Sequence, residues 1–467
     1  MAGIGFRLKR LIAEESYGGW LRAHLYGAVL SSGPWLLSIF TLASLSLLSR
    51  NIVDDPARQL FGTIVAWTYS FSLVTTGALQ MLVTRRLADA LYLGHLGVVV
   101  TAFRWIMGWT ALGHLLVGAL FYGLAPGLEP GTRLFGVMLL VVVACIWIAM
   151  IFVGAAEDYA SVVAAFFMGN AVSAGAALGG GRLWGVQGYL AGFLLGQAAI
   201  VFVLAARIQR EFPARGAPEQ LRFGRAARKY RALAVAGLCY NAAIVADRLL
   251  FWLSSEGRRV ASWFWTSPYD TPVFLAYLSV VPSLAIFLVR VETDFYERFR
   301  AYYGAATKHG TLGQLLDAKA RMADCLRESL RRVLLAQVPL SLVLVALAPW
   351  IASGLGLDRL QAGMLRPLLV GAGLHALALF GTIILLYFDR RRAAAEVSAA
   401  FLACNLLFTA ASLWLGPRFY GQGYPLAALL ATAWAYHRLD QTLCHLEYLT
   451  FTSQPMVPDD QPAAVAS

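Results

Sequence analysis

Three charged side chains lie inside long apolar stretches of the sequence. Arg104 falls within the run at residues 98–124, and Asp247 and Arg248 fall together within the run at residues 232–253. A charge at the centre of a membrane helix costs about 2.5 to 3.5 kcal/mol, so each should face a partner or a water-filled cavity. Adjacent residues point about 100° apart on a helix, so Asp247 and Arg248 are poor partners for each other. These residues either lock a bundle through interhelical ion pairs or line a translocation path.

A proline interrupts the first apolar stretch, after Ser31, Ser32 and Gly33. Pro34 removes a backbone donor, and the two serine hydroxyls can compensate for it. The pattern predicts a bent or locally unwound helix. In a membrane protein this is either a simple kink or, in a transporter with repeated halves, a border of the substrate site.

Aromatic residues cluster between two later apolar stretches, at Trp263, Trp265 and Tyr269. Aromatic side chains at a membrane–water interface usually serve as anchors. The alternative is an outer rim whose rings stack against the C–H faces of sugars.

Catalytic signatures are missing from the sequence. It has no phosphate-binding glycine loop, no paired-histidine zinc motif and no nucleophile elbow, and its five cysteines form no closely spaced pair. His114, His375 and His437 fall in or near apolar runs, where they are either packed side chains or proton carriers. We expect no catalytic centre, no metal site and no cofactor.

Composition defines the class of protein. Of 467 residues, 59% are hydrophobic and 14% are charged, and the mean hydropathy is +0.64. An average soluble chain has about 25% charged residues. Apolar runs of about 20 residues predict an all-α, polytopic membrane protein with about twelve transmembrane helices, six in each half. The net charge of +12 resides in the loops, so it predicts membrane orientation and no nucleic-acid partner.

A basic segment, residues 207–231, separates the two halves and holds eight Lys or Arg residues. The predicted organisation is a six-helix lobe at 1–206, this cytoplasmic linker, a second lobe at 232–452 and a disordered tail at 453–467. We predict that both termini are cytoplasmic, because inside segments then hold 27 basic residues and outside segments hold nine. Only the loop at Glu157 and Asp158 contradicts this bias.

The second half contains a charged cytoplasmic segment at residues 292–332. Its apolar residues recur at helical spacing, which predicts an amphipathic helix lying along the membrane or continuing into the next span. The alternative is a docking face for a partner, for which Glu292, Asp294, Arg298 and Arg327 are the candidate contacts.

Several motifs together resemble the PelG family of Pel exopolysaccharide transporters. They are MAGIGFRLKRLI at the N-terminus, SSGPWLLS in span one, ADRLLFW in span seven, YDTPVFLAYLSVVPSLAIFLV in span eight and VETDFYERFRAYY after it. The resemblance implies the fold of the multidrug/oligosaccharidyl-lipid/polysaccharide exporters, with two six-helix lobes around a central cavity.

The resemblance also implies passage of a galactosamine-rich polysaccharide across the bacterial inner membrane during biofilm matrix formation. The implied partners are a cytoplasmic glycosyltransferase and membrane proteins that include a subunit binding cyclic di-GMP. A nearly neutral polymer requires hydrogen-bonding and stacking groups, and Tyr240, Asn241, Trp67 and Tyr69 are of the right type. Two other functions stay open: an ion-coupled flippase or drug antiporter of the same superfamily, and a polytopic membrane glycosyltransferase.

Overall fold

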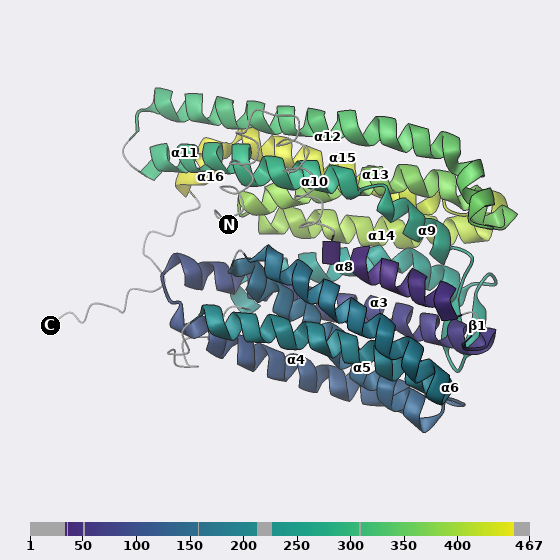
Figure 1. Ribbon diagram of the computed structural model, residues 1–467. Coiled ribbons are helices and arrows are strands. Elements are labelled where there is room, and N and C mark those ends of the chain that lie inside the picture. The colour runs from purple at the N-terminus through teal and green to yellow at the C-terminus, as the bar shows by residue number, and fades with distance from the viewer. Residues whose placement is uncertain are drawn as a thin grey trace, which may run out of the picture.

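The computed structural model describes residues 33–34, 36–49, 52–156, 158–212, 227–307 and 310–452, and most of these are helical. Eight helices in this part of the chain are long and apolar enough to cross a membrane. The chain is therefore an all-α, multi-pass membrane protein, as its composition predicts. Figure 1 shows the helices in two bundles that lie against each other.

The first bundle contains one short helix and four long ones. They are Leu36–Leu48, α3 (Asp55–Tyr92), α4 (Gly97–Gly123), α5 (Pro130–Ala155) and α6 (Tyr159–Glu211). A proline within the first turn of α3 and of α5 favours these helix starts, because the N–H that proline lacks would have no intrahelical acceptor there.

The 53-residue helix α6 is a hairpin of two helices. Trp184 and Gly185 leave the helical conformation, with Gly185 at φ +57° and ψ −135°. The chain reverses there, and Gly188 packs against the backbone of Gly180. A side chain at Gly188 would overlap that backbone, so the glycines let the two arms pack closely. The helix therefore supplies two crossing segments.

The second bundle contains the remaining long helices. They are α8 (Arg231–Leu253), α9 (Asp270–Leu278) followed by α10 (Val281–Arg290), α12 (Leu312–Gly354), α13 (Arg359–Tyr387), α14 (Arg391–Leu415) and α15 (Gly423–Cys444). Dividing α6 at its turn, and adding the less apolar α3 and α15 and the short helix Leu36–Leu48, gives twelve crossing segments. This number agrees with the prediction.

The last part of the predicted charged segment 292–332, from Leu312 onward, is the first half of α12. The capping box of Thr311 and Gln314 starts the helix, which continues without interruption into the following span. A π-helical turn η3 (Val291–Phe295), α11 (Tyr296–Thr307) and α16 (Leu446–Thr452) pack beside it. Lys319 of α12 binds Glu447 of α16 at 2.7 Å, and this bond fixes α16 to the bundle.

A β-hairpin connects α8 to α9. Its strands, β1 (Arg258–Ala261) and β2 (Phe264–Thr266), are antiparallel, with Arg258 opposite Thr266. We call this end of the molecule the hairpin end and the opposite end the far end. Near the hairpin end, a short helical turn η4 (Pro417–Phe419) links α14 to α15.

Helix α8 joins the two bundles, because it packs against α14 of the second and α3 of the first. Gly77 of α3 and Gly237 of α8 face each other so closely that a side chain at either would overlap the other's backbone. Beside them, the Asn241 amide donates a hydrogen bond to the Leu73 carbonyl at 2.9 Å.

A cluster of charged residues joins the bundles at the far end, and we call it the far-end cluster. It consists of Arg85, Asp89, Tyr230, Asp389 and Arg391. The Tyr230 hydroxyl donates to Asp89 at 2.8 Å, and the Arg391 guanidinium lies 4.8 Å from the centre of the Tyr230 ring. Arg85 bridges Asp89 at 3.2 Å and Asp389 at 3.4 Å, so α3 is tied to the α13–α14 turn.

The acidic loop that contradicts the charge bias has a basic partner in the structure. Asp158 pairs with Arg207 at the end of α6 and accepts a hydrogen bond from the Ser161 backbone at 3.1 Å. Burial raises the pKa of Asp158, but the hydrogen bonds from Ser161 and Arg207 outweigh it and lower the pKa below its ordinary value. Glu157, residues 213–226 of the predicted linker and the predicted tail 453–467 lie outside the described residues.

Candidate substrate cavity

A cavity of about 720 Å³ lies between the two bundles near the hairpin end. Residues of the first bundle form most of its wall: Pro34, Ser38, Ile39, Leu42, Ser46, Arg58, Gln59, Gly62, Thr63, Ala66, Tyr69, Ser70, Val143, Ile146, Trp147, Met150 and Phe166. The second bundle supplies Arg248, Trp252, Trp265, Thr266, Asp270, Thr271 and Phe274. A relative movement of the bundles would therefore change the shape of the cavity.

Aromatic rings line the cavity on both sides. On the first bundle, Tyr69 and Trp147 meet edge to face with ring centres 6.3 Å apart. On the second bundle, Trp252 stacks against Trp67 at 4.7 Å, and the Trp67 indole donates a hydrogen bond to the Trp265 carbonyl at 2.8 Å. These contacts fix the ring orientations, because aromatic pairs favour such geometries.

The charged side chains of the cavity differ in how far their hydrogen-bonding groups are used. The aspartate is fully bonded, whereas two arginines each keep a free nitrogen among the described residues. Asp270 accepts hydrogen bonds from the Trp252 indole at 2.9 Å, the Ser267 backbone at 2.8 Å and the Thr266 hydroxyl at 3.1 Å. By contrast, Nη1 of Arg58 and Nε of Arg248 are buried and have no hydrogen-bond partner among the described residues. The cavity therefore offers cationic donors, while its carboxylate is already saturated.

This combination suits a neutral or acidic polar ligand that has flat apolar faces. Guanidinium groups donate to hydroxyl and carbonyl oxygens, and the aromatic rings can cover the C–H faces of a sugar. A cationic ligand would meet the Arg248 guanidinium, an Arg58 guanidinium already paired with Asp55, and an occupied acid. The described ranges contain no group of three His, Cys, Asp or Glu side chains that could hold a metal ion. Hydrogen bonding and stacking are the interactions that the cavity wall offers to a ligand.

Four residues named from the sequence line this cavity, namely Pro34, Tyr69, Arg248 and Trp265. Trp67 lies directly behind the wall, 6% exposed, in its stack with Trp252.

Four further candidates lie elsewhere. Asp247 is fully buried in the second bundle, and Tyr240 bonds to His375 there. Asn241 lies in the contact between α3 and α8. Arg104 is exposed on α4, which contributes no residue to the cavity, and binds Gln209 at 3.1 Å.

The predicted helix break is only partly within the described residues. Gly33 and Pro34 are helical, and the Ser38 hydroxyl donates to the Pro34 carbonyl at 3.2 Å. Ser31 and Ser32 lie outside the described part.

The three residues of the predicted rim separate in the structure. Trp265 lines the cavity, and Trp263 is half-buried with its ring 5.7 Å from that of Phe121. Tyr269 is 1% exposed and stacks on Phe251 at 4.2 Å, because it precedes α9 and turns into the second bundle.

The candidate docking residues lie at the far end, away from the cavity. Asp294 pairs with Arg290, and the Arg298 guanidinium donates to the Asp294 carbonyl at 2.9 Å. Arg327 is 80% exposed and pairs with Asp324 at 2.9 Å. The side chain of Glu292 lies outside the described residues, although its backbone is in η3.

Sequence reasoning named none of the other residues of the cavity wall, and the most informative of these are Arg58, Trp147, Trp252 and Asp270. Trp252 and Asp270 lie within the motifs ADRLLFW and YDTPV, so the family resemblance of these motifs could have indicated them. No sequence pattern indicated Arg58 or Trp147. Arg58 precedes the apolar run of its span, and Trp147 lies in a run that is apolar throughout.

Comparison with solved structures identifies the class of the fold. The chain is similar to a mutant of the Vibrio cholerae MATE transporter VcmN, with a TM-score of 0.60 and 14% identity over 92% of this chain and 99% of that one. It is also similar to a MOP superfamily transporter from Pyrococcus furiosus, with a TM-score of 0.60 and 12% identity over 90% and 96% of the two chains. The fold is that of a MOP superfamily transporter.

The sequence then identifies the family. The model of PelG, described as an exopolysaccharide exporter (EPS-E), matches residues 1–451. The chain belongs to this family and is a multi-pass membrane exporter. Among curated proteins, none matches the sequence.

Proposed function

We propose that this protein moves a galactosamine-rich, Pel-type polysaccharide across the bacterial inner membrane for biofilm matrix formation, and that it has no catalytic centre of its own. The observation that supports this cargo is the cavity between the bundles, where aromatic faces occur together with two guanidinium nitrogens that have no hydrogen-bond partner among the described residues. N-acetylated sugars are neutral and rich in hydroxyl and carbonyl acceptors. They match these donors without adding a cation beside Arg58 and Arg248.

The proposed orientation places the hairpin end outside and both termini in the cytoplasm. Its support is the excess of basic residues in the segments at the far end. The cavity then lies toward the outer face, and the far-end cluster closes the two bundles toward the cytoplasm.

Titration of the purified chain with oligomers of N-acetylgalactosamine tests the cargo. Sugar stacking on the cavity indoles should change tryptophan fluorescence. Trp265→Ala and Trp147→Ala should weaken binding, whereas Trp105→Ala, at an exposed tryptophan of α4, should not. Equal binding by all three variants, or no saturable signal from the unsubstituted protein, would contradict this function.

We also propose that the charged face of α12 docks a cytoplasmic glycosyltransferase, within a complex that includes a membrane subunit binding cyclic di-GMP. Arg327 and Arg331 are 80% and 71% exposed there, and among the described residues their ion-pair partners, Asp324 and Glu328, lie on the same helix. Co-purification with the chromosomal neighbours tests this. Reversing both charges to Glu should reduce recovery of the glycosyltransferase, and Arg366→Glu, at an exposed position of α13 near the hairpin end, should not. Unchanged recovery would exclude this face.

A further inference from the structure

The phenol of Tyr69 is a polar group of the cavity wall whose hydrogen-bond direction the structure fixes. Its hydroxyl donates to the side-chain oxygen of Gln197, in the second arm of α6, at 2.9 Å. The Gln197 side chain is 0% exposed, so no solvent competes for this bond. A phenol oxygen whose proton is committed in this way can only accept a further hydrogen bond. Because Tyr69 lines the cavity, its oxygen is an acceptor there.

The orientation of the Gln197 amide follows from its second partner. Ser173, in the first arm of α6 and also 0% exposed, donates to the Phe193 carbonyl at 3.0 Å. A carbonyl can only accept, so the Ser173 proton is used, and its oxygen must accept from the Gln197 amide nitrogen at 3.2 Å. The amide oxygen then points to Tyr69. Three hydrogen bonds in series thus fix the direction of the Tyr69 proton.

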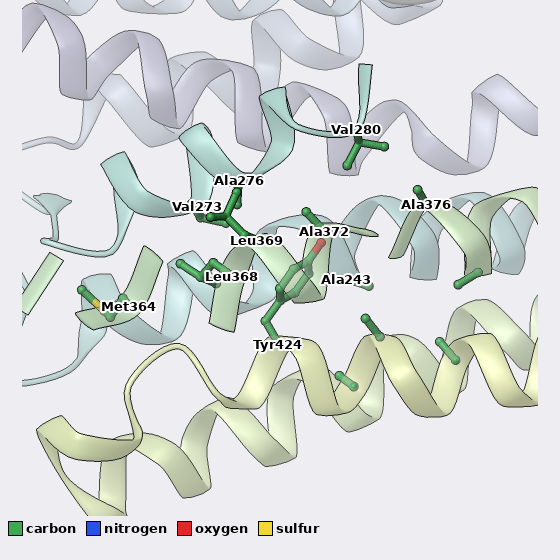
Figure 2. Packing of buried hydrophobic residues seen from close by; sticks show 14 of the residues in the cluster. Ala243, Val273, Ala276, Val280, Met364, Leu368, Leu369, Ala372, Ala376 and Tyr424 are labelled. Carbon is green, nitrogen blue, oxygen red and sulfur yellow. The ribbon is translucent and has the colours of Figure 1, made fainter. Parts of the chain in front are cut away.

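A buried phenol of the second bundle lacks such a fixed direction. Tyr424 reaches from the start of α15 into the core, among small and aliphatic side chains (Figure 2). Its hydroxyl lies 2.8 Å from Nδ1 of His375, whose Nε2 lies 3.0 Å from the Tyr240 hydroxyl. An imidazole nitrogen can donate or accept, so these neighbours do not determine which way the Tyr424 proton points. Tyr69 differs because the atom that it meets can only accept.

The groups beside Tyr69 also keep their donors within the protein. Ser38 interacts with Tyr69, and its hydroxyl donates to a backbone carbonyl at 3.2 Å. The Trp147 indole, edge to face with the Tyr69 ring, donates to the Ser72 hydroxyl at 3.1 Å. Next to Ser38, the Asn170 side-chain oxygen is buried and has no hydrogen-bond partner among the described residues. Ser38, Tyr69 and Trp147 therefore offer oxygen acceptors and an aromatic face, and we call them the Tyr69 subsite.

Donors occur on other parts of the wall. Arg248 of the second bundle keeps a buried Nε without a partner in the described part of the chain. Ser46 and Ser70 also line the cavity, and a serine hydroxyl can turn toward either a donor or an acceptor. The Tyr69 subsite and Arg248 thus require different groups of one ligand, a donor on one side and an acceptor on the other. A sugar with free hydroxyls and an acetamido group carries both.

We propose that Tyr69 selects the cargo by accepting a hydrogen bond from a free hydroxyl or amide N–H of the saccharide, and that Gln197 is the positioning residue that holds Tyr69 in this accepting state. The inference rests on the proposed saccharide cargo and adds which of its groups must be free. A sugar whose hydroxyls are methylated or acylated presents only acceptors to the Tyr69 subsite. The bond to Tyr69 is then lost, and acceptor meets acceptor.

Two forms of one saccharide test this selection on the purified full chain. The first is an oligomer of N-acetylgalactosamine, and the second is the same oligomer methylated at every hydroxyl and amide nitrogen, which keeps the acceptors and loses the donors. Tryptophan fluorescence gives both dissociation constants, and their ratio measures the discrimination. Tyr69→Phe should weaken binding of the unmodified oligomer about 2- to 12-fold, the contribution of one neutral hydrogen bond, and leave binding of the methylated one unchanged.

Two substitutions of Gln197 separate positioning from structural support. Gln197→Met removes the acceptor, which frees the Tyr69 proton to donate to an ether oxygen. The methylated oligomer should then bind about 2- to 12-fold more tightly, and the ratio should fall. Gln197→Glu should keep the ratio. A carboxylate accepts from Tyr69, and a neutral acid does so through its carbonyl oxygen while its O–H replaces the amide N–H toward Ser173.

The matched control is Tyr189→Phe, which removes a buried phenol hydroxyl of the first bundle that bonds to the Leu45 carbonyl at 3.1 Å. Tyr189 is not among the described residues that line the cavity, so this variant should keep the ratio of the unsubstituted chain. A ratio that neither Tyr69→Phe nor Gln197→Met lowers, or that Tyr189→Phe lowers equally, would overturn the inference and leave the cargo standing. Absence of saturable binding by both oligomers would overturn the cargo and the inference together.

Discussion

Replacement of Arg248 by Gln should weaken saccharide binding without unfolding the protein. The Arg248 guanidinium lines the cavity, and its buried Nε has no partner within the described ranges. A hydrogen bond to a charged donor contributes about 1.5 to 3 kcal/mol, so losing one bond to the cargo should weaken binding about 10- to 150-fold. No hydrogen bond or ion pair of this guanidinium to a described residue is lost in the free protein. The melting temperature should therefore change little.

Two measurements on the same purified variant check this prediction. Tryptophan fluorescence gives the affinity for N-acetylgalactosamine oligomers, and thermal unfolding in detergent gives the stability. Arg104→Gln is the matched control, because it removes an arginine that is exposed on α4, remote from the cavity. Unchanged affinity with Arg248→Gln, or a loss of stability that accounts for the lost binding, would refute the reasoning.

Three further predictions concern the frame around the cavity. Gly188→Leu should force apart the two arms of α6 and destabilise the protein by about 3 kcal/mol or more, measured by thermal unfolding, whereas Leu at the uncrowded Gly175 should be tolerated. Asp389→Asn should weaken the far-end cluster and increase reaction of a cysteine introduced nearby with a membrane-impermeant thiol reagent; unchanged reactivity would show that the cluster does not close that end. The lowered pKa of Asp158 stabilises the fold above the ordinary carboxyl pKa, and this contribution is lost as the pH falls through the lowered folded value. Arg207→Gln should reduce that acid dependence of the melting temperature, and an identical pH profile would contradict the assignment.

The sequence alone determined the class of protein and the number of its spans. In lipid every backbone polar group must be bonded within its own segment, so each crossing helix is a local run of apolar residues that can be read directly. The same reasoning identified Asp247 and Arg248 as costly residues. The family resemblance, which supplied a saccharide cargo, added Tyr69 as a candidate contact, and the aromatic cluster offered Trp265 as an alternative to a membrane anchor.

Only the tertiary structure decided which compartment each of these residues faces. Asp247 and Arg248 are neighbours in the chain, yet one is enclosed by the second bundle and the other lines the cavity. Their separation follows from the way α8 lies between α14 and α3, and hydropathy does not encode that packing. Trp147 and Trp252 face a common cavity for the same reason, because contacts between segments about a hundred residues apart depend on the complementary shapes of packed helices rather than on any local pattern.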